Sequence, residues 1–312
     1  MRQLVTGGAG FIGSQLVNRL LTMKVGPVRA FDNESRGQFP STPRPHLECI
    51  RGDIREPSDL RRAMQGCDLV FHLAAEATVM GCEHRPLDAH EVNTTGTLTV
   101  LRIAKELGVS RVVVASSREV YGEGCELPVR ESTPMRPKNV YGATKAAAEA
   151  YCSWTASALQ VAVLRLSNVY GPGDTDRVIP RFIADAQKNR PLTVYGGSQI
   201  IDFVWIDHVI EAFVRAGLQS RVVGSLNVGS GEGVTILEAV RRVIQLCRSG
   251  STSNILPARD AEVSRFVADV TRMEQELGVT VPPDPLKELA AICRPIAGTI
   301  SGQPASHVEA GS

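Results

Sequence analysis

The chain has 312 residues, and its 34 Lys and Arg against 33 Asp and Glu give a formal net charge of +1. The Lys and Arg residues are scattered along the chain. This distribution excludes the basic surface of a nucleic-acid-binding protein. Seven cysteines without a C-x-x-C pair do not suit a disulfide framework, no apolar run approaches the length of a membrane span, and the N-terminus lacks a secretory pattern. We therefore expect a cytoplasmic protein without nucleic-acid or membrane partners, large enough for one α/β domain with a smaller lobe.

Short apolar runs alternate with helix-length segments through the first half of the chain. The runs predicted as buried strands are residues 4–6, 28–31, 69–73, 112–115 and 161–166. Strands that are apolar on both faces and alternate with helices are typical of a parallel sheet covered on both sides. Right-handed crossovers then give a doubly wound (Rossmann) sheet.

After residue 167 this rhythm changes to loops rich in Gly and Pro. We predict a helix over residues 179–189 and a strand over 225–228. A second helix is predicted to begin with a capping box at Thr235 and Glu238 and to end near Cys247. The predicted domains are an NAD-binding domain over residues 1–166 and a smaller C-terminal substrate-binding lobe over 167–297, with segments near 202–228 returning to the first domain. Residues 298–312 lack apolar periodicity, which predicts a disordered tail.

The first predicted strand runs directly into a glycine-punctuated loop. Gly7, Gly10 and Gly13 let backbone N–H groups approach a pyrophosphate, whose charge the N-terminus of the following helix stabilises. The second strand ends at Asp32, where a carboxylate accepts the ribose hydroxyls and repels a 2′-phosphate. The sequence therefore predicts NAD rather than NADP. Arg36 either weakens that preference or is an ordinary loop arginine.

Two further polar residues have two interpretations each. Asp53 follows a third apolar run, so it either lies beside the adenine or caps a helix that starts near Ser58. Asn93 is either a helix cap or a polar group near the active site.

Tyr141 and Lys145 are spaced four residues apart, so they share one face of a helix. A lysine ammonium in that place favours the tyrosinate and is expected to pull the pKa of the phenol towards neutrality. Tyr141 then becomes a usable general base. Alone this spacing is weak evidence, because surface helices contain it by chance.

Five ordered motifs give the chain a family resemblance. They are TGGAGFIG from Thr6, HLAA from His72, SSREVYG from Ser116, YGATK from Tyr141 and RLSNVYGP from Arg165. From Arg2 to about residue 280, the chain resembles the extended short-chain dehydrogenase/reductase family, and within it the nucleotide-sugar epimerases and dehydratases.

The resemblance implies a role for each motif. Tyr141 is the expected base, Lys145 lowers its pKa and holds the nicotinamide ribose, and Ser117 binds the reacting sugar hydroxyl. Asn168 and Arg259 are expected at the nucleotide diphosphate, because a guanidinium forms a planar fork that suits phosphate. Tyr121 is interpreted as packing. The residues expected at the cofactor are Gly7, Gly10, Phe11, Ile12, Gly13, Asp32, Asn33, Asp53, Ile54, Leu73, Ala74, Ala75, Tyr141 and Lys145.

The chain departs from the family pattern in three places. Ile201 replaces an arginine expected at the diphosphate, and His208 stands where a helix-starting aspartate is usual. Arg118 and Glu119 fill positions that hold Asp-Glu in sugar 4,6-dehydratases and mostly small residues in 4-epimerases. The last departure leaves the reaction type open, although pairing with Arg118 would make Glu119 a poor acid.

We expect an NAD-dependent nucleotide-sugar 4-epimerase that works through a transient 4-keto sugar and needs no metal, because the dinucleotide is the oxidant. The alternative is a dehydratase or decarboxylase in which Glu119 acts, and a remote alternative is a non-catalytic NAD-binding sensor. The expected partners are a nucleotide-activated sugar and a second copy of the chain. The expected dimer contact is the helix after Tyr141, whose residues at this contact are Ala146, Ala147, Ala150, Tyr151 and Trp154.

Overall fold

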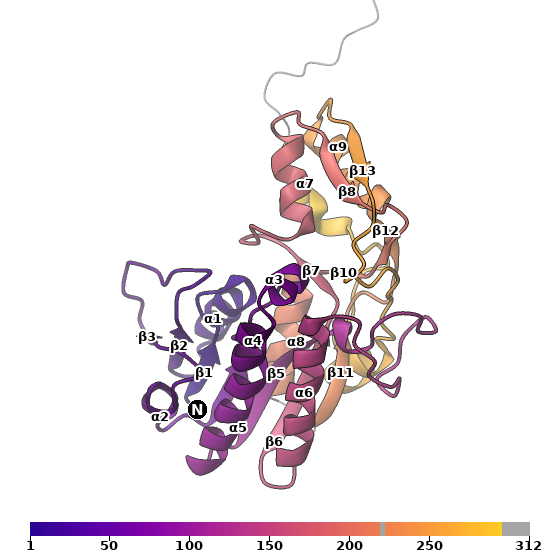
Figure 1. Ribbon diagram of the computed structural model, residues 1–312. Coiled ribbons are helices and arrows are strands. Elements are labelled where there is room, and N and C mark those ends of the chain that lie inside the picture. Colours follow the sequence, from indigo (N-terminus) through magenta and orange to yellow (C-terminus); the bar gives the residue numbers. More distant parts are fainter. Residues whose placement is uncertain (219–221, 295–312) are drawn as a thin grey trace, which may run out of the picture.

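The computed structural model describes residues 1–218 and 222–294, and its largest element is a parallel seven-stranded sheet (Figure 1). The strand order is β11-β6-β5-β4-β1-β2-β3. This order reverses direction at β1, so the doubly wound α/β fold predicted from the sequence is confirmed. The strands are β1 (Gln3–Thr6), β2 (Val28–Asp32), β3 (Leu47–Arg51), β4 (Leu69–His72), β5 (Arg111–Ser117), β6 (Gln160–Leu166) and β11 (Gly224–Val228).

Helices cover both faces of this sheet, because its strands are apolar on both sides. One face packs against α1 (Phe11–Met23) and α8 (Ile206–Leu218), in a core that includes Leu16 and Phe213. The other face packs against helices that contribute Leu60, Leu101 and Cys152 to a second core. Those helices are α2 (Pro57–Met64), α5 (Gly96–Glu106) and α6 (Val140–Thr155), with the short α3 (Val79–His84), α4 (Pro86–His90) and π-helical η1 (Glu91–Thr95) preceding α5.

The segment that includes α8 and β11 lies with the large sheet although it follows lobe residues in the chain. Strand β11 pairs in parallel with β6, with Leu226 opposite Leu164. Helix α8 packs on α1 and on the central strands. The chain therefore leaves the sheet after β6 and returns to it with α8 and β11.

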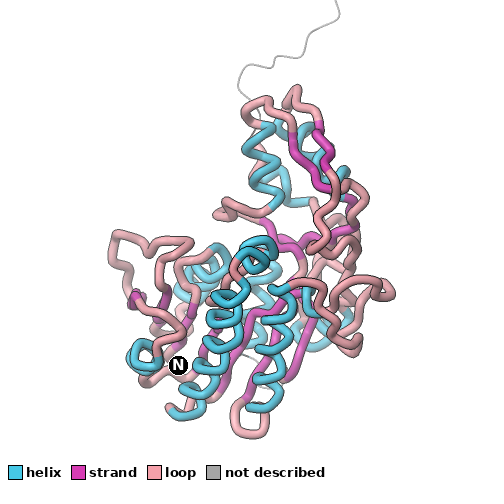
Figure 2. The backbone as a smooth tube through the Cα atoms, viewed as in Figure 1, coloured by secondary structure: helices cyan, strands magenta, loops and turns pink. Residues whose placement is uncertain are grey.

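The smaller lobe is built around α7 (Val178–Ala186) and α9 (Ile236–Cys247), and Figure 2 shows it above the end of the large sheet. Phe182, Leu192 and Val240 belong to its core. Half of the predicted capping box is present: the Thr235 side chain accepts a hydrogen bond from the Glu238 N–H, while the Glu238 carboxylate binds Arg241 and Arg242 instead of the Thr235 N–H. Three strand pairs complete this half: β7 (Asn168–Tyr170) with β10 (Phe203–Trp205), β8 (Leu192–Tyr195) with β13 (Ser253–Leu256), and β9 (Ile200–Ile201) with β12 (Val234–Thr235).

Three single-turn elements remain: η2 (Arg118–Val120), η3 (Met273–Leu277) and η4 (Lys287–Ala291). The predicted tail, residues 298–312, lies outside the described residues. Within the described part of the chain, no helix has both the length and the apolar character needed to cross a bilayer.

Candidate active site

A cavity of about 940 Å³ lies at the carboxyl ends of the parallel strands and extends to the lobe. Every residue that the sequence assigned to the cofactor, the catalytic group or the substrate lines this cavity. Parallel strands present their carboxyl ends along one edge, so residues far apart in the chain converge there. The roles of these residues remain predictions, and the geometry decides what each can do.

The glycine loop between β1 and α1 lines the cavity and is packed too closely for side chains at Gly7 and Gly13. Gly7 has φ +72°, and a Cβ there would lie 2.7 Å from the Ala74 nitrogen. A Cβ on Gly13 would overlap the Gly7 carbonyl oxygen. Helix α1 starts after Gly10, and no side chain caps it. An uncapped helix N-terminus behind a glycine cradle fits the phosphates of a dinucleotide.

Asp32 ends β2 beside this loop, as predicted. Its carboxylate accepts hydrogen bonds from the backbone N–H groups of Ala9 (3.1 Å) and Glu34 (2.7 Å). Burial raises the pKa of Asp32, and the hydrogen bonds oppose that rise. These bonds fix the carboxylate at the cavity wall, where it fits a ribose diol.

Asp53 lines the cavity, and its interpretation as a helix cap is wrong. Helix α2 starts at Pro57, and its N-cap residue is Glu56. Asp53 instead binds the guanidinium of Arg55, with 2.6 Å between Oδ2 and Nη2, and this hydrogen bond lowers the pKa of Asp53.

Asn93 is also not a cap. It is buried in η1, accepts from the Glu76 N–H (2.8 Å) and donates to the Thr144 hydroxyl (3.0 Å). Asn93 thereby connects the loop after β4 to α6, which carries Tyr141 and Lys145.

Tyr141 and Ser117 meet from different elements. Ser117 is the last residue of β5, and Tyr141 lies in the first turn of α6, whose N-cap residue Asn139 accepts from the Gly142 N–H (2.8 Å). Burial raises the pKa of Tyr141 to about 12, while the Arg177 charge and a hydrogen bond with Ser117 oppose that rise. The phenol and the serine side chain both line the cavity.

Lys145 differs from the sequence-based expectation. Its ammonium donates to the Ala115 carbonyl oxygen (2.9 Å), and burial lowers the pKa of Lys145 to about 8. The largest opposing charge on Tyr141 is Arg177, so the expected shift of the Tyr141 pKa towards neutrality by Lys145 is not found. The physical reason is that the lysine ammonium binds a carbonyl oxygen near the end of β5, while burial disfavours the charged forms of both side chains.

Arg118 and Glu119 form the ion pair that the sequence suggested, with 2.9 Å between Nη2 and Oε1. The other Glu119 oxygen accepts from the Asn139 amide (2.7 Å). The Arg118 Nε donates to the Asn168 amide oxygen (2.8 Å), and its guanidinium lies 5.6 Å from the Phe266 ring centroid. Both charged side chains are nearly buried, with exposed fractions of 11% and 6%.

Arg259 lies at the lobe end of the cavity. Its guanidinium lies 3.6 Å from the Tyr195 ring centroid and pairs with Glu262 at 3.0 Å. Ile201 also lines the cavity there, so an apolar side chain occupies the position of the expected arginine. His208 lies in the first turn of α8, where Asp207 supplies the acidic residue instead.

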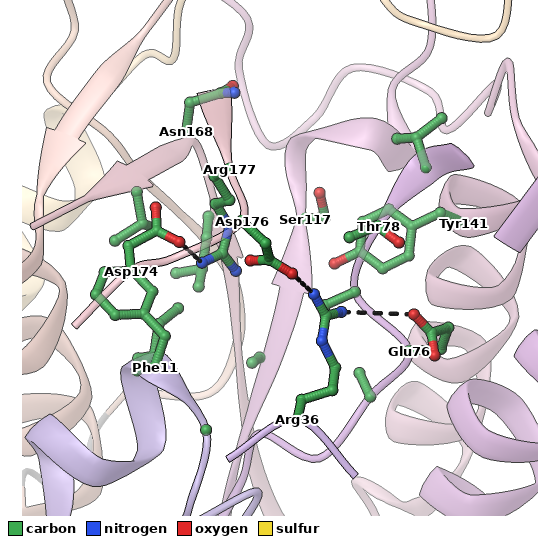
Figure 3. Close-up of a pocket in the computed structure, with 18 of the residues that line it drawn as sticks. Phe11, Arg36, Glu76, Thr78, Ser117, Tyr141, Asn168, Asp174, Asp176 and Arg177 are labelled. Atoms are coloured by element: carbon green, nitrogen blue, oxygen red, sulfur yellow. Dashed lines mark hydrogen bonds and ion pairs between the residues drawn. The ribbon is translucent and has the colours of Figure 1, made fainter. Parts of the chain in front are cut away.

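Charged residues line the cavity beside the cofactor positions (Figure 3), and of these the sequence reasoning named Arg36 but missed Glu76, Asp174, Asp176 and Arg177. Arg36 pairs with Asp176 and, at 3.5 Å, with Glu76. Arg177 pairs with Asp174 at 3.3 Å and lies 5.1 Å from the Phe11 ring centroid. Asp174 is buried, and its Oδ2 has no hydrogen-bond partner among the described residues. The only sequence signal for this loop was its density of Gly, Pro and Asp.

Metal ligation finds no support in the described residues, because residues 1–218 and 222–294 contain no group of three or more His, Cys, Asp or Glu side chains that could hold an ion. The residues that do converge on the cavity suit a dinucleotide and an acid–base pair.

Comparisons with known proteins agree with this geometry. A sequence model of the NAD dependent epimerase/dehydratase family matches residues 3–229. UDP-glucuronic acid decarboxylase 2 of Arabidopsis thaliana is 30% identical over 293 residues, and the match covers 89% of this chain but only 64% of that longer relative.

Two solved structures have the same fold. The UDP-glucose 4-epimerase of Thermotoga maritima, solved with UDP-glucose, has a TM-score of 0.86 and 28% identity over 90% of this chain and 94% of that one. DesIV, a dTDP-glucose 4,6-dehydratase from Streptomyces venezuelae solved with NAD, has a TM-score of 0.87 and 30% identity over 93% and 95%. The similar proteins thus include a decarboxylase, an epimerase and a dehydratase.

Proposed function

We propose that this chain, which belongs to the NAD dependent epimerase/dehydratase family, inverts carbon 4 of a nucleotide-activated hexose through a transient 4-keto sugar. The cofactor is NAD, in keeping with the family and with the cradle formed by the glycine loop and Asp32. The observation that carries the choice of epimerisation is the pairing of Glu119, because both of its oxygens are engaged inside the protein.

In the proposed cycle, Ser117 and Tyr141 hold the C4 hydroxyl of the sugar, and Tyr141 takes its proton. NAD held by the glycine loop and Asp32 would supply reversible hydride transfer at C4. A sugar that turned in the cavity between oxidation and reduction would leave with C4 inverted. Tyr141 then gives the proton back to the C4 oxygen. Lys145 lies one helical turn after Tyr141, next to the expected nicotinamide ribose.

Elimination or decarboxylation would need a further group that moves a proton at C5 or C6. Glu119 is the candidate because it lines the cavity. Its Oε1 binds the Arg118 guanidinium and its Oε2 accepts from the Asn139 amide, so groups of the protein engage both oxygens. This pairing favours a structural role for Glu119.

The alternative remains a decarboxylase or dehydratase, and the similarity to a UDP-glucuronic acid decarboxylase favours it. In that reaction one oxygen of Glu119 would leave its partner in the protein and transfer a proton to or from the substrate. A non-catalytic NAD-binding sensor is the remote alternative, and it would bind NAD without converting any sugar.

Replacing Glu119 by glutamine separates these reactions. Glutamine keeps the shape and still accepts from Arg118, so an epimerase retains at least about a tenth of its turnover. An eliminating enzyme loses about two to four orders of magnitude and accumulates NADH, because oxidation still proceeds. Turnover and absorbance of NADH on the same sample measure both quantities. A collapse with NADH accumulation would overturn the epimerase proposal.

The nucleotide is proposed to bind at the lobe end of the cavity. Arg259 presents a guanidinium to the diphosphate, and Asn168 has its amide oxygen engaged by Arg118. The amide NH₂ of Asn168 is then the side left to bind oxygen acceptors such as phosphate. Arg177, which lines the cavity at the start of α7, adds positive charge to this region in place of the arginine missing at Ile201.

A homodimer is proposed through α6, which carries exposed aromatic residues. Trp154 is 69% exposed and Tyr151 is 36% exposed, and Ala150 on the same helix is also exposed. We expect sedimentation to give a dimer mass for the unaltered chain and a lower mass for Trp154→Asp, because a charge replaces apolar contact area. A monomer mass for the unaltered chain at all concentrations would reject the dimer.

A further inference from the structure

The loop between β7 and α7 reaches from the lobe to the cofactor-binding domain. Its contacts with α1 are a hydrogen bond from the Gln15 amide to the Pro172 carbonyl oxygen (3.2 Å) and the stacking of Arg177 on Phe11. A third contact reaches the loop after β2, where Asp176 binds the Arg36 guanidinium. Three contacts from separate residues hold Asp176 at the mouth of the cavity.

Arg36 is the residue whose place makes this contact important for the cofactor. It follows Asp32 by four residues and lines the cavity together with Asp32 and Asn33, where the adenosine ribose is expected. A nearby arginine is the usual receptor for the 2′-phosphate of NADP. Its guanidinium has five donors in a fork that matches a phosphate group.

In this chain the guanidinium is directed elsewhere. Figure 3 shows it between Asp176 on one side and Glu76 on the other. Glu76 is the weaker partner, because its carboxylate lies 3.5 Å from Arg36 and is shared with Arg85 at 3.5 Å. Asp176 is therefore the residue that holds Arg36 in this orientation.

We propose that Asp176, a residue of the substrate lobe, determines cofactor specificity by holding Arg36 away from the position of a 2′-phosphate. Asp32 repels the 2′-phosphate directly, and Asp176 binds the Arg36 guanidinium that would otherwise bind this phosphate. Asp176 acts through Arg36 and is therefore a positioning residue. The proposal concerns the cofactor alone, so its failure leaves the proposed sugar chemistry untouched.

To test this, the purified protein is incubated with an equimolar mixture of NAD and NADP until its bound cofactor has exchanged. After gel filtration, the bound nucleotides are released and quantified by chromatography. The variants are Asp176→Ala, Asp32→Ala, the double variant of the two, and the triple variant that adds Arg36→Ala. The matched control for charge is Asp32→Ala with Asp185→Ala, because Asp185 lines the same cavity but pairs with Arg190 rather than Arg36.

We expect Asp32→Ala alone to reduce the preference for NAD over NADP. Adding Asp176→Ala should raise the bound ratio of NADP to NAD by about ten-fold or more, the effect of one charge-assisted phosphate contact. Arg36→Ala should abolish that gain, and Asp185→Ala should not produce it. Asp176→Ala alone should raise the ratio by a few-fold, which keeps a test available if the Asp32 variants lose the cofactor.

Two results would overturn the proposal. One is an unchanged ratio on adding Asp176→Ala, with the total bound nucleotide preserved. The other is a gain that survives Arg36→Ala, which would assign the phosphate contact to another cation such as Arg51 at the end of β3.

Discussion

Replacing Tyr141 by phenylalanine is expected to lower turnover by about two to four orders of magnitude, the usual contribution of a positioned acid or base. The substitution removes one hydroxyl from the cavity that Ser117 also lines. The ring and the glycine cradle stay, so bound NAD should remain close to that of the unaltered protein. The two measurements are the rate of product formation and the NAD content of the purified protein.

Tyr151→Phe is the matched control for this change. Tyr151 lies on the same helix but is 36% exposed on its outer surface, so losing its hydroxyl should leave turnover unchanged. Turnover within about ten-fold of the unaltered protein in Tyr141→Phe would remove this tyrosine from the mechanism.

The largest expected effect on stability belongs to a buried ion pair behind the active site. Arg165 on β6 binds Glu149 on α6, with 2.7 Å between Nη2 and Oε2, and both side chains are at most 6% exposed. Glu149 also accepts a hydrogen bond from Ser116, the residue before Ser117, and it follows Lys145 by one helical turn. The pair thus joins β5, β6 and α6 at the depth of the catalytic residues.

Arg165→Met is expected to lower the free energy of unfolding by about 3–5 kcal/mol, because it leaves a buried carboxylate without its cation. Urea unfolding followed by circular dichroism measures the change. Arg19→Met is the control, since Arg19 pairs with Glu211 at the surface at 3.2 Å and its loss should cost less than about 1 kcal/mol.

A double variant, Arg165→Met with Glu149→Met, tests the cause. Removing both charges together should recover much of the lost stability, because no unpaired charge remains. A double variant as unstable as the sum of the single ones would show that packing, rather than the uncompensated charge, explains the loss.

The sequence predicted the large sheet and the glycine loop because these features depend on local patterns. Strand β1, the turn at Gly7 and helix α1 follow one another in the chain, so apolar runs and glycine spacing suffice to place them. The sequence also placed Ser117 and Tyr141 together at one site, since each belongs to a short ordered motif, and both line the cavity. Their catalytic roles stay predictions.

Contacts between distant segments could not be predicted in the same way. Arg36 and Asp176 are 140 residues apart, and nothing local in either loop points to the other. The Lys145 ammonium lies against the Ala115 carbonyl because of how α6 packs on β5, a detail that the i, i+4 spacing with Tyr141 does not contain. Even a contact between neighbouring residues was not predicted in the case of Asp53. Its partner Arg55 is two residues away, yet the sequence left open whether Asp53 contacts the adenine or caps a helix.

The central claim is that the chain inverts C4 and leaves the sugar otherwise unchanged. The most direct measurement incubates the purified protein with a panel of UDP-, dTDP-, GDP- and CDP-sugars, then determines product mass by mass spectrometry and C4 configuration by NMR. The account predicts at least one sugar whose mass is unchanged and whose C4 is inverted. A product lighter by the mass of water or of carbon dioxide, with no C4 epimer from any sugar, would contradict it.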